Sequence, residues 1–446
     1  MTGSDLCQRM REDWNRRARE DAAYYVAFGR REQSEEEFFA TGRELALGLA
    51  REIKRLKPLP YGRGSETQAG SGIAGWRALE IGCGLGRLMR PLAPYFAEIH
   101  GVDVSDEMIR RAEDKLRDVP NARLLLSSGA DLAMLPDESF HFVYSYAVFQ
   151  HIPSREVVLR YLAEARRVMA TGGIFRFQVN GLPETAARYD TWNGVRISAA
   201  EIAAFARDHD LQLLALEGAL TQYTWVTLQK RPEGWRSRLL ERRPAVRAGI
   251  RRITNAHSSE PVAPSRGRFA CISLWLEGLP EDCDLNHLEV TIAGAPGQPE
   301  YLGPPQADGL QQLNVRLPAS VPSGLQPLEI SWLGRVIAPR ATVRVIPPGP
   351  LVPRIVSVTD GIDLLSGTRI VSRSVKVGLE EVATPSQLRA AVDGAAIEGF
   401  EFFCVDPAPP RFEVNFTLPP SIGPGPHELE LSLGARRFPP IAIEVA

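Results

Sequence analysis

The sequence predicts an α/β domain with N-terminal helices and a parallel, helix-wrapped sheet, followed by two all-β sandwich domains. Three observations lead to this prediction. Between Trp76 and Lys230, short apolar runs alternate with amphipathic segments, which is typical of strands and helices in a doubly wound sheet. From Arg266 onward, short runs of alternating apolar and polar residues are separated by Pro and Gly, as in a β-sandwich. A sequence repeat in this second region indicates two sandwiches.

The composition fits a folded chain of several domains. The chain has 446 residues, of which 44% are hydrophobic and 24% charged. Residues 1–21 lack the apolar core of a signal peptide, and no later stretch approaches the roughly 18 apolar residues of a membrane-spanning helix. The five cysteines are scattered without metal-ligand spacing. We therefore expect a cytoplasmic protein with free thiols, no metal site and no integral membrane segment.

The first two predicted domains are a helical lid and the α/β domain. Residues 4–56 are expected to be helical, because apolar residues such as Trp14 and Ala18 recur there at helical spacing. We interpret residues 1–56 as an N-terminal helical lid and residues 57–230 as the α/β domain. The apolar runs 211–218 and 222–230 are joined by a short turn, so they predict a hairpin that closes one edge of the sheet.

A change in charge marks the boundary of the second half. Net charge is about +5 for residues 1–256 and about −7 for the remainder. The basic stretch at this boundary contains Trp235 as its only aromatic residue, which favours a solvated linker or an interdomain contact over a membrane-binding or nucleic-acid-binding patch. We therefore expect a basic linker over residues 231–265.

The repeat divides the C-terminal region into two sandwiches. The segment LPASVPSGLQPLEIS (Leu317–Ser331) is echoed by LPPSIGPGPHELELS (Leu418–Ser432). The first copy with its surroundings resembles the immunoglobulin-like repeat modules found in bacterial proteins, which implies a fold and no particular chemistry. We expect immunoglobulin-like sandwiches over residues 266–346 and 353–446, with loops suited to recognition or to docking a protein partner.

A glycine-rich turn in RALEIGCGLGRLMRPLA identifies the ligand site. Gly82, Gly84 and Gly86 give the pattern G-x-G-x-G, and Arg87 stands where a dinucleotide-binding turn needs its last glycine. No Gly-Lys-Ser/Thr follows, so a phosphate-binding loop is excluded. Asp103 ends the next predicted strand, where one carboxylate accepts hydrogen bonds from two ribose hydroxyls. This combination indicates S-adenosylmethionine.

The same region resembles the class I methyltransferases, specifically the type 11/12 group of small-molecule and lipid modifiers. The segments that carry the likeness occur in family order between Trp76 and Lys230: LEIGCGLGRL, HGVDVSDEMIRRA, ADLAMLPDESFHFVYSYAVFQHI and VMATGGIFRFQV. The resemblance implies a Rossmann-like fold, methyltransferase activity and S-adenosylmethionine as the cofactor.

The resemblance also implies a role for individual residues. Glu80 would orient the ammonium group of the cofactor through the loop, and Asp103 would hold the ribose. Met108 would pack on adenine, and Asp131 would meet the adenine amino group, with the backbone of Leu132 beside the ring. The other implied cofactor-binding residues are Gly82, Cys83, Gly84, Gly86 and Val104.

Candidates for the chemistry follow the fourth predicted strand. Methyl transfer is an in-line displacement in which positioning alone lowers the barrier substantially, and a base is needed only when the acceptor begins protonated. Ligands of doubly wound sheets lie beyond the carboxyl ends of the strands, which selects Tyr146, Gln150 and His151. His151 is the best candidate for a base, because an unperturbed imidazole titrates near neutrality. The alternative role of this segment is to begin a helix and pack.

Three hypotheses of function follow. The leading one is a methyltransferase that modifies a hydroxyl, amine or carboxylate of a small molecule, lipid or glycan precursor. The second is a non-catalytic S-adenosylmethionine-binding scaffold whose sandwiches mediate interactions. The third, a nucleic-acid methyltransferase, is disfavoured by the near-neutral net charge and because YSYAVF follows the fourth strand in place of an Asn/Asp-Pro-Pro-Tyr/Phe motif.

Overall fold

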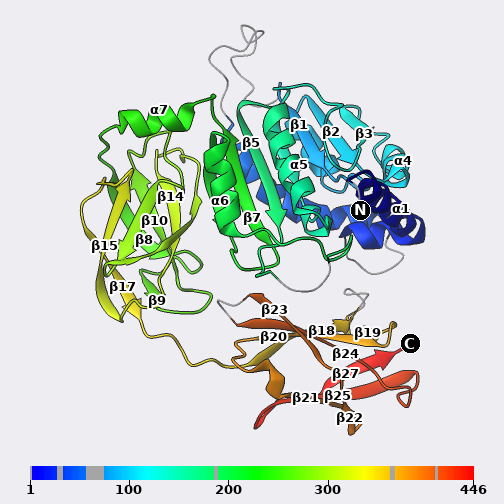
Figure 1. Cartoon of the computed structure of the whole chain (residues 1–446). Helices are drawn as coiled ribbons and strands as arrows, with labels where there is room; N and C mark the ends of the chain where they lie inside the picture. Colours follow the sequence, from blue (N-terminus) through cyan, green and yellow to red (C-terminus); the bar gives the residue numbers. More distant parts are fainter. Residues whose placement is uncertain (1–2, 28–33, 57–74, 185–188, 362–366, 407–409) are drawn as a thin grey trace. The chain divides into compact units, whose positions relative to one another are not determined.

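The chain forms two compact units in a computed structural model that describes residues 3–27, 34–56, 75–184, 189–361, 367–406 and 410–446 (Figure 1). The first unit consists of Met1–Ala22, Phe39–Ser265 and Phe269–Pro347. The second consists of Ala23–Phe38, Arg266–Arg268 and Pro348–Ala446.

The α/β part of the first unit has a mixed, Rossmann-like sheet, in which the predicted parallel strands are followed by the predicted antiparallel pair of strands. Its strands are β1 (Arg77–Ile81), β2 (Glu98–Asp103), β3 (Ala122–Leu126), β4 (Phe140–Ser145), β5 (Met169–Val179), β6 (Leu211–Glu217) and β7 (Thr224–Lys230). They lie in the order β3-β2-β1-β4-β5-β7-β6, in which β3 to β5 are parallel and β7 is antiparallel to both of its neighbours. The carboxyl ends of β1, β2 and β4 therefore share one edge of the sheet.

Helices cover both faces of this sheet. The helices of the chain are α1 (Gly3–Ala27), α2 (Glu35–Ile53), α3 (Met89–Leu92), α4 (Asp106–Lys115), α5 (Arg155–Val168), α6 (Ala199–Asp208) and α7 (Trp235–Arg242), with short 3-10 helices at Ala93–Tyr95, Phe149–His151 and Pro385–Gln387. The helices α5 and α6 pack on the face nearer the viewer in Figure 1, where the apolar side chains of β1, β4 and β5 form one core with them. The opposite face packs against α2 and α3.

Serine caps fix where the helices of the near face begin. The Ser154 hydroxyl accepts a hydrogen bond from the Val157 backbone N–H at the start of α5. Ser198 and Glu201 form a reciprocal capping box at the start of α6. Such caps satisfy backbone donors that a helix leaves unpaired, so they favour the observed starts of α5 and α6.

The sheet continues beyond the α/β part, which the sequence did not predict. The following strands are β8 (Gly249–Asn255), β9 (Val262–Pro264), β10 (Cys271–Glu277), β11 (Leu288–Ile292), β12 (Ala295–Pro296), β13 (Gln298–Leu302), β14 (Gln311–Arg316), β15 (Gly324–Trp332), β16 (Arg335–Val336) and β17 (Ala341–Ile346). Strand β13 pairs with β6 through Tyr301 and Ala215, and β14, β10 and β8 extend the same sheet to eleven strands among the described residues.

Two expectations about this region need correction. Strand β6 does not end the sheet, because β13 occupies the edge where the predicted hairpin was expected to close it. Residues 231–265, predicted to be a linker, contain α7, β8 and β9, and the stretch is ordered because Trp235 and Leu239 are buried against the following β-rich region. A second sheet, β12-β11-β15-β17-β9, packs over the first across a shared apolar core.

The second unit is also β-rich. Its strands are β18 (Arg354–Asp360), β19 (Arg369–Ile370), β20 (Ser374–Glu380), β21 (Leu388–Val392), β22 (Ala395–Ile397), β23 (Glu401–Asp406), β24 (Arg411–Thr417), β25 (Gly425–Leu433), β26 (Arg436–Arg437) and β27 (Ile441–Val445). They form two sheets around one core. The repeat recurs in the structure, because Gly324 and Gly425 begin β15 and β25 with φ angles of 122° and 124°. The immunoglobulin-like identity of both regions stays a prediction.

The remaining general expectations concern membranes, thiols and metals. Within the described ranges, no helix has the length and apolarity to span a membrane. The thiols of Cys7, Cys83, Cys271 and Cys283 are free. The same described residues hold no group of three or more side chains suited to a metal ion. Apart from the linker over residues 231–265, the domain boundaries stay predictions, as does the role of residues 1–56 as a lid.

Candidate active site

The glycine loop after β1 is shaped by packing within the protein. Gly82, Gly84 and Gly86 have φ angles of 73°, 51° and 77°, a region that side chains other than glycine rarely adopt. A Cβ atom on Gly82 would lie 2.3 Å from the side chain of Val148, and one on Gly86 would lie 2.5 Å from Leu116. Gly82 and Gly86 therefore make room for neighbouring side chains. The absence of a Cβ atom at these two positions allows the observed backbone conformation of the loop.

A buried carboxyl group lies beneath this loop. Glu80 on β1 is 4% exposed and accepts a hydrogen bond from the Tyr144 hydroxyl on β4 at 3.0 Å. Burial raises the pKa of Glu80 to about 8, although the Tyr144 hydroxyl and the nearby Arg87 guanidinium oppose the rise. A cation brought to this carboxyl would favour its ionised form.

Asp103 is held at the end of β2 by two backbone donors. Its Oδ2 accepts from the Gly84 N–H and its Oδ1 from the Ser105 N–H, each at 2.9 Å. A carboxylate has about four acceptor positions, so each oxygen keeps capacity for a further donor. Burial raises the pKa of Asp103, whereas these hydrogen bonds act in the opposite direction.

The residues after Asp103 begin α4 and continue the site. Ser105 caps this helix by accepting from the Met108 N–H, and Met108 is 1% exposed. Val104 is half-buried, and its backbone carbonyl accepts from the Arg11 guanidinium on α1. Cys83 in the glycine loop is buried, and burial raises the pKa of its thiol.

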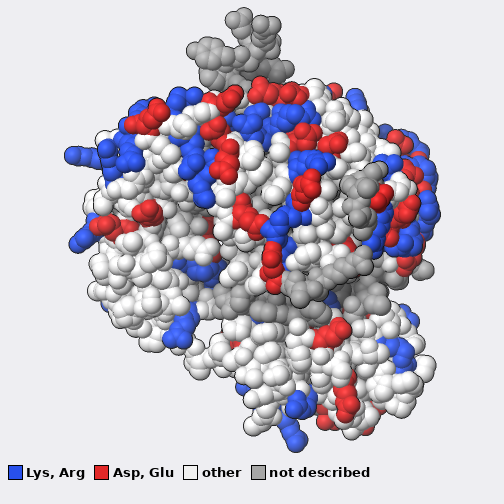
Figure 2. Space-filling view, viewed as in Figure 1, with Lys and Arg blue, Asp and Glu red and all other residues white. Residues whose placement is uncertain are grey.

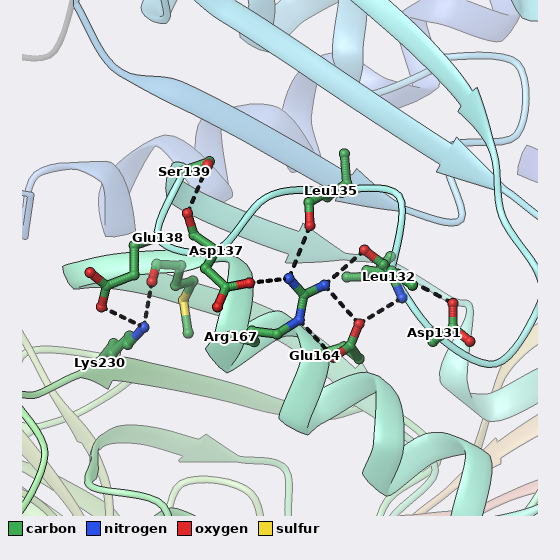
Figure 3. A network of polar contacts seen from close by, with 11 residues as sticks. Asp131, Leu132, Leu135, Asp137, Glu138, Ser139, Glu164, Arg167 and Lys230 are labelled. Carbon is green, nitrogen blue, oxygen red and sulfur yellow. Dashed lines mark hydrogen bonds and ion pairs between the residues drawn. The ribbon is translucent and has the colours of Figure 1, made fainter.

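The turn after β3 is clamped from α5 (Figure 3). The Arg167 guanidinium donates to the backbone carbonyls of Leu132 and Leu135 and to both oxygens of Glu164, at 2.8 to 2.9 Å. Glu164 in turn accepts from the Leu132 N–H at 3.0 Å. Asp131 is half-buried, and its Oδ1 accepts from the Ala133 N–H.

These contacts bear on the expected role of Leu132. Its backbone N–H and C=O are both engaged within the protein, because Glu164 and Arg167 reach them from α5. Its side chain is fully buried. The backbone of Leu132 therefore holds the turn in place, and Asp131 is the member of this pair with a side chain left at the surface of the turn.

Tyr146 lies in a stack of rings and guanidinium groups at the carboxyl end of β4. Its ring packs against Trp225 on β7 with centroids 5.8 Å apart. The Arg87 guanidinium lies 5.2 Å from the Tyr146 ring centroid, and the Arg176 guanidinium lies 4.5 Å from that of Trp225. Arg176 is also ion-paired with Glu217 at 2.8 Å. This stack forms a wall on the α2 face of the sheet.

His151 and Gln150 are buried in the 3-10 helix that follows β4. His151 is 6% exposed, and its Nδ1 lies 2.8 Å from the backbone carbonyl oxygen of Trp192. Burial lowers the pKa of His151 to about 4, so the ring is neutral at pH 7. Gln150 is 5% exposed, and its Oε1 has no hydrogen-bond partner among the described residues.

The helix α1 supplies residues that sequence reasoning missed. Arg11 donates to the carbonyls of Val104 and Ser127 at the ends of β2 and β3. The Asn15 side-chain N–H donates to the Asp106 carboxylate, and its amide oxygen accepts from the Ser105 hydroxyl. No motif marks these positions, because their partners lie 90 to 116 residues away along the chain.

The site fits S-adenosylmethionine on its own chemistry. The carboxyl groups of Glu80 and Asp103 lie at the ends of adjacent parallel strands. Asp103 has spare acceptor capacity for ribose hydroxyls, and Glu80 would ionise beside an ammonium group. Two further polar groups follow strands of the same sheet: Oε1 of Gln150, which has no hydrogen-bond partner among the described residues, and the half-buried carboxyl group of Asp131.

Comparison with known proteins agrees with this reading. The sequence profile described as "Methyltransferase domain" matches residues 79–177. The chain contains a class I S-adenosylmethionine-dependent methyltransferase domain. Its enzymatic class is S-adenosylmethionine-dependent methyltransferase, and its methyl donor is S-adenosylmethionine.

The methyltransferase domain has several curated relatives. It is 28% identical over 163 residues to the ubiquinone biosynthesis O-methyltransferase of Xanthomonas oryzae pv. oryzae (strain PXO99A), covering 33% of this chain and 67% of that protein. It is 36% identical over 112 residues to the malonyl-[acyl-carrier protein] O-methyltransferase of Geobacter sulfurreducens, covering 25% and 40%. It is 26% identical over 165 residues to phosphoethanolamine N-methyltransferase 2 of Caenorhabditis elegans, covering 35% and 37%.

Proposed function

We propose that the protein transfers a methyl group from S-adenosylmethionine to a hydroxyl, amine or carboxylate of a small molecule, lipid or glycan precursor. The observation that carries the proposal is the grouping of Glu80, Asp103 and His151 at the carboxyl edge of one sheet. The relatives act, by their names, in O- and N-methylation, which fits this range of acceptors.

The cofactor supplies an electrophilic methyl group, and the chain's own residues position it. In this proposal Asp103 accepts hydrogen bonds from the ribose, and Glu80 lies beneath the ammonium group. Met108 and Val104 pack beside adenine, and Asp131 accepts from its amino group. The loop residues Gly82, Cys83, Gly84 and Gly86 follow the methionine portion with their backbone.

On the acceptor side, we assign the chemistry to Tyr146, Gln150 and His151. The neutral His151 ring accepts the proton of a hydroxyl or amine, and Oε1 of Gln150 accepts a hydrogen bond from the same kind of group. Tyr146 forms one wall through its stack with Trp225. Both groups accept hydrogen bonds, which favours a methyl acceptor that carries a proton, so hydroxyls and amines rank above carboxylates.

The surface supports a small acceptor over a nucleic acid. On the face in Figure 2, acidic and basic side chains lie next to one another. Several arginines of the chain are paired with carboxylates, including Arg110 with Glu107 and Arg167 with Asp137. A nucleic-acid-binding face instead presents basic groups together. The β-rich regions are proposed to serve in recognition or docking.

An acceptor screen tests this proposal. Purified protein is incubated with S-adenosylmethionine and separate pools of phenols, aliphatic alcohols, amines and carboxylates, and S-adenosylhomocysteine release is measured with Asp103→Asn as the background. We expect release above background with a hydroxyl or amine pool, and a product heavier by one methyl group. Cofactor binding without transfer to any pool would instead support the non-catalytic scaffold.

A further inference from the structure

The contacts of α1 divide between two sides of the site. Arg11 and Asn15 reach the ends of β2 and β3, on the side proposed for the cofactor. Asp13, Trp14 and Arg17 instead contact the segment between β5 and α6 and the His151 ring. Asp13, Trp14 and Arg17 therefore lie on the side proposed for the methyl acceptor, and the proposed function gives them no role.

Arg17 and Thr191 form a buried junction between α1 and this segment. The Arg17 guanidinium donates to the Thr191 backbone carbonyl and to its hydroxyl oxygen, each at 3.1 Å. The Thr191 hydroxyl donates in turn to the Asp13 carboxylate at 2.7 Å. Arg17 is 9% exposed and Thr191 is 3% exposed, so these contacts are shielded from water. They fix the backbone that leads directly into Trp192.

His151 is held by this junction on two sides. Its ring lies edge-on to Trp14 and tilted against Trp192, with ring centroids 5.5 Å apart in both cases. The Arg17 guanidinium lies 4.7 Å from the Trp14 ring centroid and 5.2 Å from that of Trp192, so it ties the two indoles together. A movement of Arg17 or Thr191 therefore displaces the two indole rings that pack against His151 and the backbone carbonyl that contacts its Nδ1.

The contact with Trp192 determines the tautomer of His151. A backbone carbonyl oxygen only accepts hydrogen bonds, so the Nδ1 atom 2.8 Å away must carry the proton. In a neutral ring the Nε2 atom then has a lone pair and no proton. This Nε2 makes no hydrogen bond to the described residues.

We propose that Arg17 and Thr191 are positioning residues that hold the Trp192 carbonyl against His151, and so keep Nε2 in the form that accepts a proton from the methyl acceptor. This inference rests on the proposed function. In the step, the acceptor's O–H or N–H bond breaks and its proton moves to Nε2. The freed electron pair forms the bond to the methyl carbon, and the electron pair of the broken carbon–sulfur bond stays on sulfur.

The charged groups near His151 set the direction of the expected titration. Burial lowers the pKa of His151 most, and the hydrogen bond with the Trp192 carbonyl raises it. Arg17 from α1 also lowers this pKa, and Asp190 from the neighbouring segment raises it. The Asp13 carboxylate stands behind Thr191. Removal of the Arg17 charge therefore raises the pKa of His151, and removal of the Thr191 hydroxyl loosens the Trp192 carbonyl without changing any charge.

Nitrogen NMR of histidine-labelled protein tests the proposal without a known acceptor. The chain has seven histidines, and the spectrum of a His151→Gln variant assigns the signal of this ring. In the wild type we expect a neutral ring with a protonated Nδ1 from pH 6 upward, because burial lowers the pKa of His151 to about 4. In Arg17→Met and in Thr191→Val we expect signals of both tautomers, because each variant loosens the backbone that carries the Trp192 carbonyl. Arg19→Met, an exposed change on the same helix, leaves the His151 signal unchanged.

The outcomes separate this inference from the proposed function. If His151 keeps the wild-type tautomer and midpoint in both variants while the other histidine signals show a folded protein, Arg17 and Thr191 do not position it. With an acceptor in hand, we expect kcat to fall about tenfold or more in Thr191→Val with the cofactor Kd unchanged. Undiminished methyl transfer by His151→Gln would remove His151 from the reaction. A wild-type protein that fails to bind S-adenosylmethionine would refute the proposed function while the NMR result stands.

Discussion

At the scale of single residues, Glu80 connects the cofactor site to the stability of the fold. Its carboxyl group has an ordinary pKa of 4.5, which burial raises to about 8. Between these pH values the native state keeps a proton that the unfolded state has lost, so the free energy of unfolding falls as pH rises from 4.5 to 8. We expect Glu80→Gln to flatten this part of the pH profile and to raise the melting temperature at pH 8.

Thermal unfolding at pH 5 and pH 8 measures this effect. Glu113→Gln provides a control, because Glu113 is exposed on α4. The expected result is that the melting temperature of Glu80→Gln changes less between the two pH values than that of the wild type or the control. Equal changes in all three proteins would mean that Glu80 is ionised in the native state.

The sequence predicted which residues lie at the carboxyl edge of the sheet, but it did not predict their electrostatic state. His151 was selected because an ordinary imidazole titrates near neutrality, whereas burial lowers the pKa of this ring to about 4. That burial comes from Trp14 and Trp192, which lie far from His151 along the chain. A single sequence does not reveal such contacts.

At the scale of elements, α5 controls the turn proposed to contact adenine. We expect Arg167→Met to weaken S-adenosylmethionine binding by about tenfold, because the variant loses the hydrogen bonds to the carbonyls of Leu132 and Leu135 and frees Glu164 from its partner. Calorimetric titration measures the change in Kd.

The matched control for this prediction is Arg160→Met on the same helix. Arg160 pairs with Glu156 at the surface, where an ion pair contributes little to stability. We expect its Kd to equal that of the wild type. If Arg167→Met also binds like the wild type, the turn holds its shape without the clamp.

Local patterns predicted the elements better than their partners. The alternation of apolar runs predicted the strands and helices of residues 76–230, and the same pattern predicted that Asp103 ends a strand, as it does in β2. The engagement of the Leu132 backbone escaped prediction, because it depends on a helix thirty-two residues further along the chain.

At the scale of the whole chain, the methyltransferase sheet and the first β-rich region form one continuous structure. Strand β13 pairs with β6, and Gln212 on β6 donates to the backbone carbonyls of Glu281 and Cys283. The Arg55 guanidinium after α2 also contacts the Leu302 carbonyl. Residues from distant parts of the sequence therefore cover the edge of the sheet, which no local pattern indicates.

Truncation tests this continuity. A fragment that ends at Lys230 exposes the buried strand β6 and an open sheet edge, so we expect it to aggregate or to melt at a lower temperature than the full chain. A fragment that ends at Pro347 keeps the first unit, and we expect it to stay free of aggregates in size-exclusion chromatography with cofactor affinity unchanged. If the fragment that ends at Lys230 is stable and free of aggregates, the methyltransferase domain does not need the first β-rich region in order to fold.

The measurement that tests the central claim most directly is calorimetric titration of the full chain with S-adenosylmethionine and S-adenosylhomocysteine. We predict binding of both, weakened at least about tenfold in Asp103→Asn and unchanged in Asp114→Asn, which alters an exposed carboxylate on α4. Absence of binding by the folded wild type, or equal binding by Asp103→Asn, would contradict the proposed cofactor site.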